Sequence, residues 1–103
     1  MGLANIVPGY VGLGYSKDTP PLFDQSGDGE NLTTTNASST ASNVTAPSGR
    51  GGRDPVFRVM LSEEGYVRIN GTAAVGTGQR CVADVEYYFP AGPGVTLSVI
   101  DTA

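Results

Sequence analysis

Histidine and tryptophan are absent from this chain of 103 residues, and there is only one cysteine. Histidine is the commonest general base and the commonest metal ligand, so Ser-His-Asp, Cys-His and His-metal sites are excluded within one chain. The single Cys81 cannot form an internal disulfide, and it excludes a zinc site made of several cysteines. The chemistry left to the chain is that of carboxylates, hydroxyls and a few cations.

Positive charge and long apolar runs are also scarce. The chain has six Lys and Arg against ten Asp and Glu, a formal charge of −4, and its cations are not clustered. Nucleic-acid binders need clustered cations to displace counterions from phosphates, so neither DNA nor RNA is expected as a partner. No apolar run approaches the roughly 20 residues that span a bilayer, and the first residues lack the pattern of a signal peptide. We therefore expect synthesis in the cytoplasm and no membrane association.

Carboxylate pairs are the arrangement that remains for catalysis: Asp24 with Asp28 and Glu30, Glu63 with Glu64, and Asp84 with Glu86. Paired carboxylates can hydrolyse glycosides, but they need a substrate cleft, usually with aromatic walls. Because the chain is short and has no Trp, we expect no enzymatic activity and no cofactor. Cys81 follows Arg80, which could favour the thiolate, but without a base nearby a structural thiol is the preferred interpretation.

Two short runs superficially match ligand-binding motifs. Residues 24–31 have the oxygen-rich and glycine-rich composition of a calcium loop, but they lack EF-hand spacing, so a solvated acidic turn is preferred and no metal is predicted. The run from Arg50 to Arg53 resembles an RNA-binding RGG segment. A flexible hinge whose arginines pair with carboxylates of a neighbouring subunit is the favoured interpretation.

The residue pattern predicts an all-β fold. There are 15 Gly and 7 Pro, and no segment has the apolar spacing of a helix. Apolar residues alternate in several short runs, which predict strands at 56–61, 66–70, 73–75, 85–89 and 95–100. The four-residue, glycine-containing loop after the first run predicts that the first two strands form a hairpin. Residues 55–103 are therefore expected to form a small antiparallel β-sandwich or jelly-roll-like domain.

Residues 1–54 are predicted to form a long, extended and irregular N-terminal arm. Residues 31–49 have no charge and no aromatic ring and are rich in Ser and Thr, so they bury too little apolar surface to become ordered alone. The arm also contains a strand that alternates with glycine, which allows close backbone approach to another surface, and a proline-rich plug. Its apolar anchors are Val11, Leu13, Tyr15, Leu22 and Phe23. We expect this arm to take its order from a partner protein.

A β domain of this size gains little stability from its own core. Domains below about 70 residues rarely obtain more than about 3–5 kcal/mol from a single core, and oligomerisation is a common remedy. Without a disulfide or a metal, we expect a homo-oligomer, a trimer, or a subunit docked on a larger scaffold.

The stretches Tyr66–Ala74 and Glu86–Ile100 resemble small virion proteins of tailed bacteriophages. In those proteins, short strands carry a V-R-I-x-G step and a later Y-F-P-A-G corner before a final apolar strand. The overall plan is similar to that of head decoration (cement) proteins, which implies a homotrimer in the virion that binds the major capsid protein or another scaffold protein and stabilises the capsid surface. The expected partner-binding residues are Val11, Leu13, Tyr15, Leu22, Phe23, Arg50 and Arg53.

Three other functions remain open at this point. Tail, neck and fibre-base subunits share the same style of sequence. A carbohydrate- or receptor-binding module is the alternative from another class, with Tyr66, Tyr87 and Tyr88 forming an exposed stacking surface. A calcium-stabilised adhesin fragment is the third.

Overall fold

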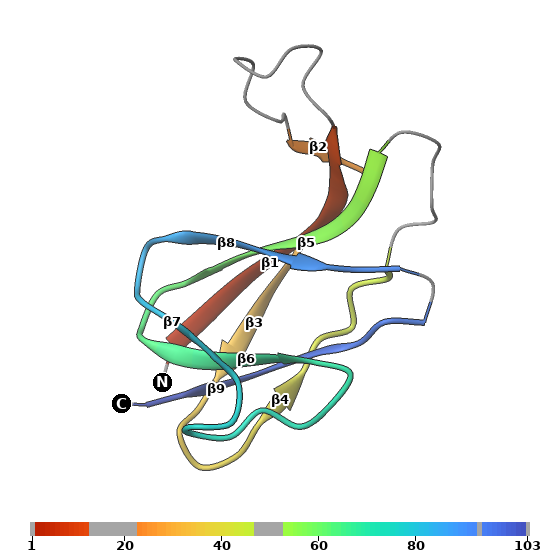
Figure 1. The fold of residues 1–103 in the computed structure, drawn as a ribbon. Helices are drawn as coiled ribbons and strands as arrows, with labels where there is room; N and C mark the ends of the chain where they lie inside the picture. Colours follow the sequence, from red (N-terminus) through yellow and green to blue (C-terminus); the bar gives the residue numbers. More distant parts are fainter. Residues whose placement is uncertain (1, 13–22, 47–52, 93, 103) are drawn as a thin grey trace.

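The computed structural model describes residues 2–12, 23–46, 53–92 and 94–102. Over these residues the chain is a sandwich of two antiparallel β-sheets without a helix, which confirms the predicted fold class (Figure 1). The strands are β1 (Gly2–Gly12), β2 (Phe23–Gln25), β3 (Glu30–Thr34), β4 (Thr40–Ala41), β5 (Arg53–Leu61), β6 (Gly65–Ile69), β7 (Gln79–Cys81), β8 (Glu86–Pro90) and β9 (Leu97–Asp101). None of the described segments forms a helix long and apolar enough to cross a membrane.

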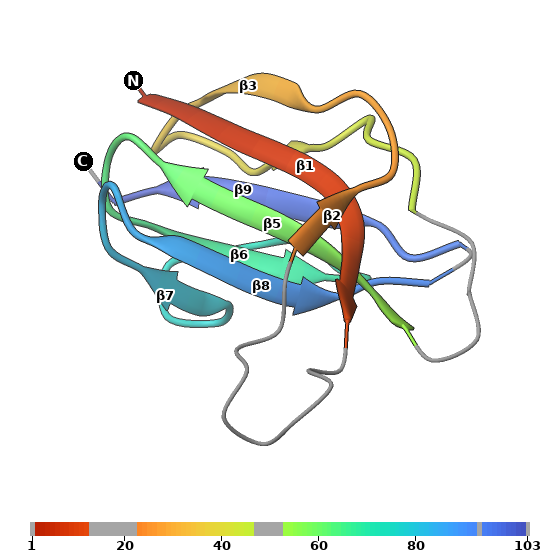
Figure 2. The ribbon, with the colours of Figure 1, turned by 90° about the horizontal axis from the view of Figure 1, so that it is seen from above.

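β1 is the central strand of the larger sheet, which has five strands. β5 pairs with one edge of β1 and β8 pairs with the far edge of β5, while β2 and β3 follow one another along the other edge of β1. The second sheet has four strands in the order β4-β9-β6-β7. Figure 2 shows β1, β5 and β8 side by side in one layer, with β9 and β6 in the layer behind them.

Residues 2–12 belong to this sandwich and not to a separate arm. β1 is paired with β5 from Ala4, opposite Leu61, to Gly12, opposite Arg53. Ala4 and Ile6 are both fully buried in the core. The predicted boundary between residues 54 and 55 falls inside β5. The alternation with glycine, which begins at Val11, predicts a strand that lies flat against another surface. In the structure Val11 pairs with the protein's own β2 and β5, whereas Leu13 and Tyr15 lie outside the described residues.

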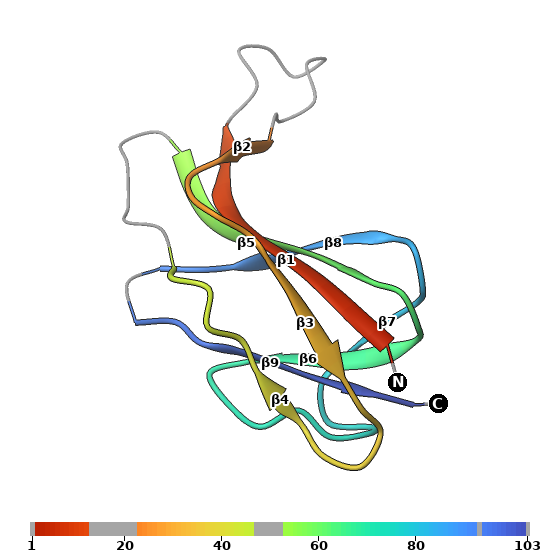
Figure 3. The same ribbon diagram turned by 180° about the vertical axis from the view of Figure 1, so that it is seen from behind.

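The Ser/Thr-rich segment also contributes to the sandwich, up to residue 46 (Figure 3). Thr34 is buried, and its hydroxyl donates a 2.6 Å hydrogen bond to Oδ1 of the buried Asp101 in β9. The Glu30 carboxylate accepts a hydrogen bond of 3.0 Å from the Ser42 hydroxyl. The expectation that a partner must order residues 31–49 therefore does not hold for the described part of them. Strands β1 and β9 supply the hydrogen bonds and the apolar surface that the segment lacks.

β5 and β6 are consecutive strands, but they lie in different sheets. β5 pairs with β1 and β8, whereas β6 pairs with β7 and β9, so the predicted hairpin is wrong. Phe57, Val59 and Leu61 of β5 and Val67 of β6 are all buried in one core cluster. An alternating pattern identifies the buried face of a strand but not its hydrogen-bonded neighbour. The intervening loop crosses from one layer of the sandwich to the other.

The strand predicted at residues 73–75 is a loop in the structure. Ala73 is buried, and its amide donates a 2.9 Å hydrogen bond to the Ser98 hydroxyl, which in turn donates one of 2.7 Å to the Gly71 carbonyl. This loop contacts β9 from the side away from the core. This contact covers Ser98, while Leu97 and Val99 are buried in the core, and every residue of β9 is buried.

Candidate docking groove

The paired ends of β1, β2 and β5 extend beyond β8 and form one end of the molecule (Figure 1). β8 ends beside Val56, whereas β1 and β5 remain paired for three further positions. Val11 of β1 has Phe23 of β2 on one side and Asp54 of β5 on the other. Directly opposed residues of antiparallel strands point to the same face, so these three side chains stand in one row on the outer face of the sheet.

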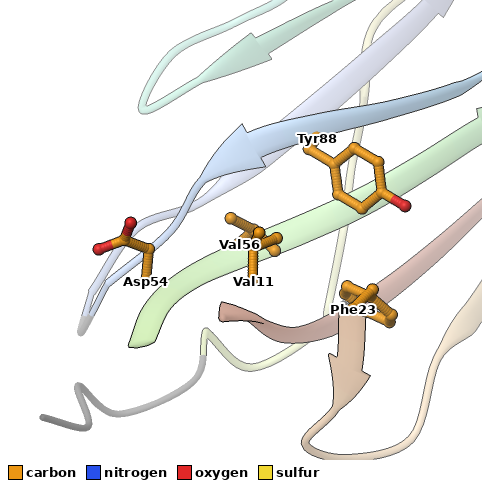
Figure 4. A pocket seen from close by; sticks show the side chains of 5 residues that line it. All are labelled: Val11, Phe23, Asp54, Val56 and Tyr88. Carbon is orange, nitrogen blue, oxygen red and sulfur yellow. The ribbon is translucent and has the colours of Figure 1, made fainter. Parts of the chain in front are cut away.

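A groove of about 350 Å³ is lined by Val11, Phe23, Asp54, Val56 and Tyr88 (Figure 4). The two valines lie in the middle, with the Asp54 carboxylate at one end and the two aromatic rings at the other. The centroids of the rings are 5.9 Å apart and their planes are inclined by 51°. The groove is therefore an apolar trough with an aromatic end and an acidic end.

Arg58 lies next to the aromatic end. It is opposite Tyr88 in the register of β5 and β8, and its guanidinium carbon is 4.9 Å from the centroid of the Phe23 ring. The Tyr88 hydroxyl donates a 3.1 Å hydrogen bond to the Glu86 carboxylate. Partial burial, and then this hydrogen bond, raise the pKa of Tyr88, so the phenol remains neutral at physiological pH. Within the part of the chain that the structure describes, Asp54 is the charged residue that lines the groove, and Arg58 and Glu86 lie next to its aromatic end.

Val11 and Phe23 are the two predicted partner-binding residues that the structure brings together. Arg53 is the first residue of β5, and Leu13, Tyr15, Leu22 and Arg50 lie outside the described residues. Sequence reasoning missed Asp54 and Val56 as members of this site. They join Val11 only through the pairing of β1 with β5, which no local pattern reveals.

The three tyrosines proposed as a stacking surface do not form one. Tyr87 and Tyr88 are consecutive in β8, so they point to opposite faces of the sheet, and Tyr66 belongs to the other sheet. The Tyr87 hydroxyl accepts a 3.0 Å hydrogen bond from the Val82 amide. Tyr88 instead forms an aromatic pair with Phe23.

No known protein family, curated protein or solved structure matches this chain.

The acidic run at residues 24–31 is divided between β2, a loop and β3. Its Glu30 carboxylate holds the backbone that follows β4 by accepting hydrogen bonds from Ser42 and Asn43. Among the residues that the structure describes, no three His, Cys, Asp or Glu side chains are grouped so as to hold a metal ion. The Glu30 side chain thus contributes to the sandwich, whereas residues 25–29 are exposed.

Cys81 is fully buried in the core, and burial raises the pKa of its thiol to about 11. The adjacent Arg80 does not activate the thiol, because its guanidinium forms an ion pair with Glu64. A buried thiol with a raised pKa is a poor nucleophile. This environment agrees with a structural role for Cys81.

We expect Cys81 to react with an aromatic disulfide reagent only after the protein unfolds. The native thiol is both inaccessible and protonated, whereas the unfolded chain exposes a thiol of ordinary pKa. The change in absorbance after mixing, with and without denaturant, measures the labelling rates of the unfolded and the folded protein. Rapid labelling of the folded protein, at a rate independent of denaturant, would contradict this burial.

Proposed function

We propose that this protein is a structural subunit of a virion, a head decoration protein, and that it docks on its scaffold through the groove. The groove is the observation that supports docking: it places Phe23 and Tyr88 beside two valines on an outer sheet face, and Tyr88 is 47% exposed. Aromatic anchors beside an apolar pocket are typical of the centre of protein interfaces. Modest contacts of this kind add up by avidity when many copies bind a symmetric shell.

The assignment to a virion is supported by the resemblance of residues 66–74 and 86–100. In the described part of these stretches lie residues of strands β6, β8 and β9, with one corner after β6 and a second after β8. Asn70, with a φ of 55°, follows β6, and its side-chain oxygen accepts a 3.0 Å hydrogen bond from the Thr96 amide. The second corner follows β8, where the Ala91 amide donates a 2.9 Å hydrogen bond to the Pro55 carbonyl. This corner fixes the end of the strand that carries Tyr88 into the groove.

The test is incorporation into particles of the virus that encodes the chain. Gradient-purified virions should contain the wild-type protein in a stoichiometric amount. Replacing both Phe23 and Tyr88 by Ala should lower incorporation by roughly 30-fold or more, because truncation of an interface anchor typically costs about 2 kcal/mol or more. Val75→Ala is the matched control, since Val75 is 59% exposed and does not line the groove.

Circular dichroism and thermal melting of the purified variants must first show that they remain folded. Absence of the chain from purified particles would reject the virion assignment, and full incorporation of the double variant would reject the groove as the docking site. Location of the protein on the tail in electron micrographs would favour a tail, neck or fibre-base subunit. Sedimentation of the purified chain tests the homotrimer, which is part of this proposal.

A carbohydrate- or receptor-binding module is the second candidate function. The observation that favours it is that one groove contains both a carboxylate, Asp54, and two aromatic rings, since sugars are bound by ring stacking together with polar groups. The rings, however, contact each other at an inclination of 51° and do not form a flat platform. Binding of the isolated chain on a glycan array, abolished by Tyr88→Ala, would favour this candidate.

A further inference from the structure

Asp54 is the feature of the groove that apolar docking leaves unexplained. Its side chain is exposed, and no residue that the structure describes forms a hydrogen bond or an ion pair with it. Arg58 is four residues away on the same strand, which corresponds to about 13 Å along β5. At that distance the two charges interact weakly in water. The acidic end of the groove is therefore available for a cation.

We propose that the groove binds a lysine or arginine side chain of the partner protein. The aliphatic stem would lie on Val11 and Val56, and the terminal cation would reach the Asp54 carboxylate. Lys and Arg commonly bury their stems on apolar surface while the charged end remains at a polar group or in water. This inference rests on the proposed docking function and specifies the chemistry of the partner.

Charge complementarity favours this occupant over the others. An anion would be repelled by Asp54 and by the net charge of −4. A wholly apolar side chain would cover the Asp54 carboxylate and remove water from it without replacing the lost hydrogen bonds, which is costly. A basic side chain satisfies both parts of the groove, because it places methylene groups on the valines and a cation at the carboxylate.

The test is an NMR titration of the isolated chain with n-butylammonium and with n-butanol, which has the same stem but no charge. We expect butylammonium to shift the methyl resonances of Val11 and Val56 and to bind about fivefold more tightly than butanol, as for an exposed ion pair. This preference should fall as salt is raised from about 0.1 M to about 1 M. It should disappear in Asp54→Asn.

Asp84→Asn is the matched control for the titration. Asp84 is also exposed, it does not line the groove, and its φ of 61° is well tolerated by Asn. The control variant should keep the preference for butylammonium. Equal binding of the two probes to the wild type, no binding of either, or a preference that survives in Asp54→Asn would each overturn the proposal. Tighter binding of methyl glucoside than of butylammonium would overturn it in favour of a sugar site.

Particle incorporation separates this inference from the proposed function. Asp54→Asn should be incorporated about fivefold less than Asp84→Asn if a basic partner residue occupies the groove. Full incorporation of Asp54→Asn, together with loss of the Phe23 and Tyr88 double variant, would reject the cation and leave apolar docking intact. Absence of even the wild-type chain from particles would reject the virion assignment, while the titration would still report on the groove.

Discussion

Ile6→Ala is expected to lower the free energy of unfolding by about 2–5 kcal/mol, the usual cost of truncating a large aliphatic side chain in a core. Ile6 is fully buried in β1, between Glu30 of β3 and Val59 of β5 in the register of the sheet. The alanine would leave a cavity at the centre of the five-stranded sheet, where the strands on both sides limit relaxation. Since small domains have only about 5–15 kcal/mol of stability, urea denaturation should show a large shift of the midpoint.

Leu3→Ala is the matched control on the same strand. Leu3 is 50% exposed on the outer face, so its truncation should change the free energy of unfolding by no more than about 0.5 kcal/mol. A separate arm held by an outside partner predicts a different result, because neither substitution would then affect the stability of the isolated protein. Equal urea midpoints for Ile6→Ala and Leu3→Ala would contradict the central position of β1.

Gly65→Ala is expected to destabilise the protein by about 3 kcal/mol, the upper end of the usual cost of overpacking. The added Cβ would lie 2.5 Å from the Ile100 carbonyl oxygen and 3.2 Å from Cδ1 of Leu61. The first contact is with the backbone of β9, which is the direct neighbour of β6 and is buried along its whole length. The clash cannot be relieved by a change of rotamer. It would separate the two central strands of the smaller sheet.

Gly92→Ala is the same substitution at a site where it should do no harm. Apart from Gly92 and its two chain neighbours, no described residue has an atom within 4 Å of a Cβ added at Gly92. The expected result is a neutral effect, or a gain of about 0.4–1 kcal/mol from reduced freedom of the unfolded chain. Thermal and urea denaturation of both variants measure the difference. Similar stabilities for the two would mean that β6 and β9 are not in the close contact described.

Local patterns predicted β5, β6, β8 and β9 and part of β1, but not β2, β3, β4 or β7 among the described strands. The alternation in residues 56–61 correctly placed Phe57, Val59 and Leu61 on the core face, and the turn signal at Asn70 coincides with a residue of positive φ. Residues 73–75 were misassigned as a strand. They form a loop in which Ala73 is buried and bonded to Ser98 of β9, whereas Val75 is 59% exposed.

The groove was predictable only in part. Val11 and Phe23 were expected to serve together as apolar anchors, and they are direct register partners in the structure. Asp54, Val56 and Tyr88 were not grouped with them, because β1, β5 and β8 are separated by long stretches of chain. Their neighbourhood is set by strand order, which composition and periodicity do not encode.

The sequence by itself determined the fold class and the inward faces of the main strands, because side chains alternate along a strand wherever the chain is extended. It also determined the absence of histidine chemistry and of a disulfide. The tertiary structure alone decided which strands are neighbours, that residues 2–12 form the centre of a sheet, and that residues of four strands line one groove. These features depend on hydrogen bonds and packing between segments far apart in the chain, and such contacts have no local signature.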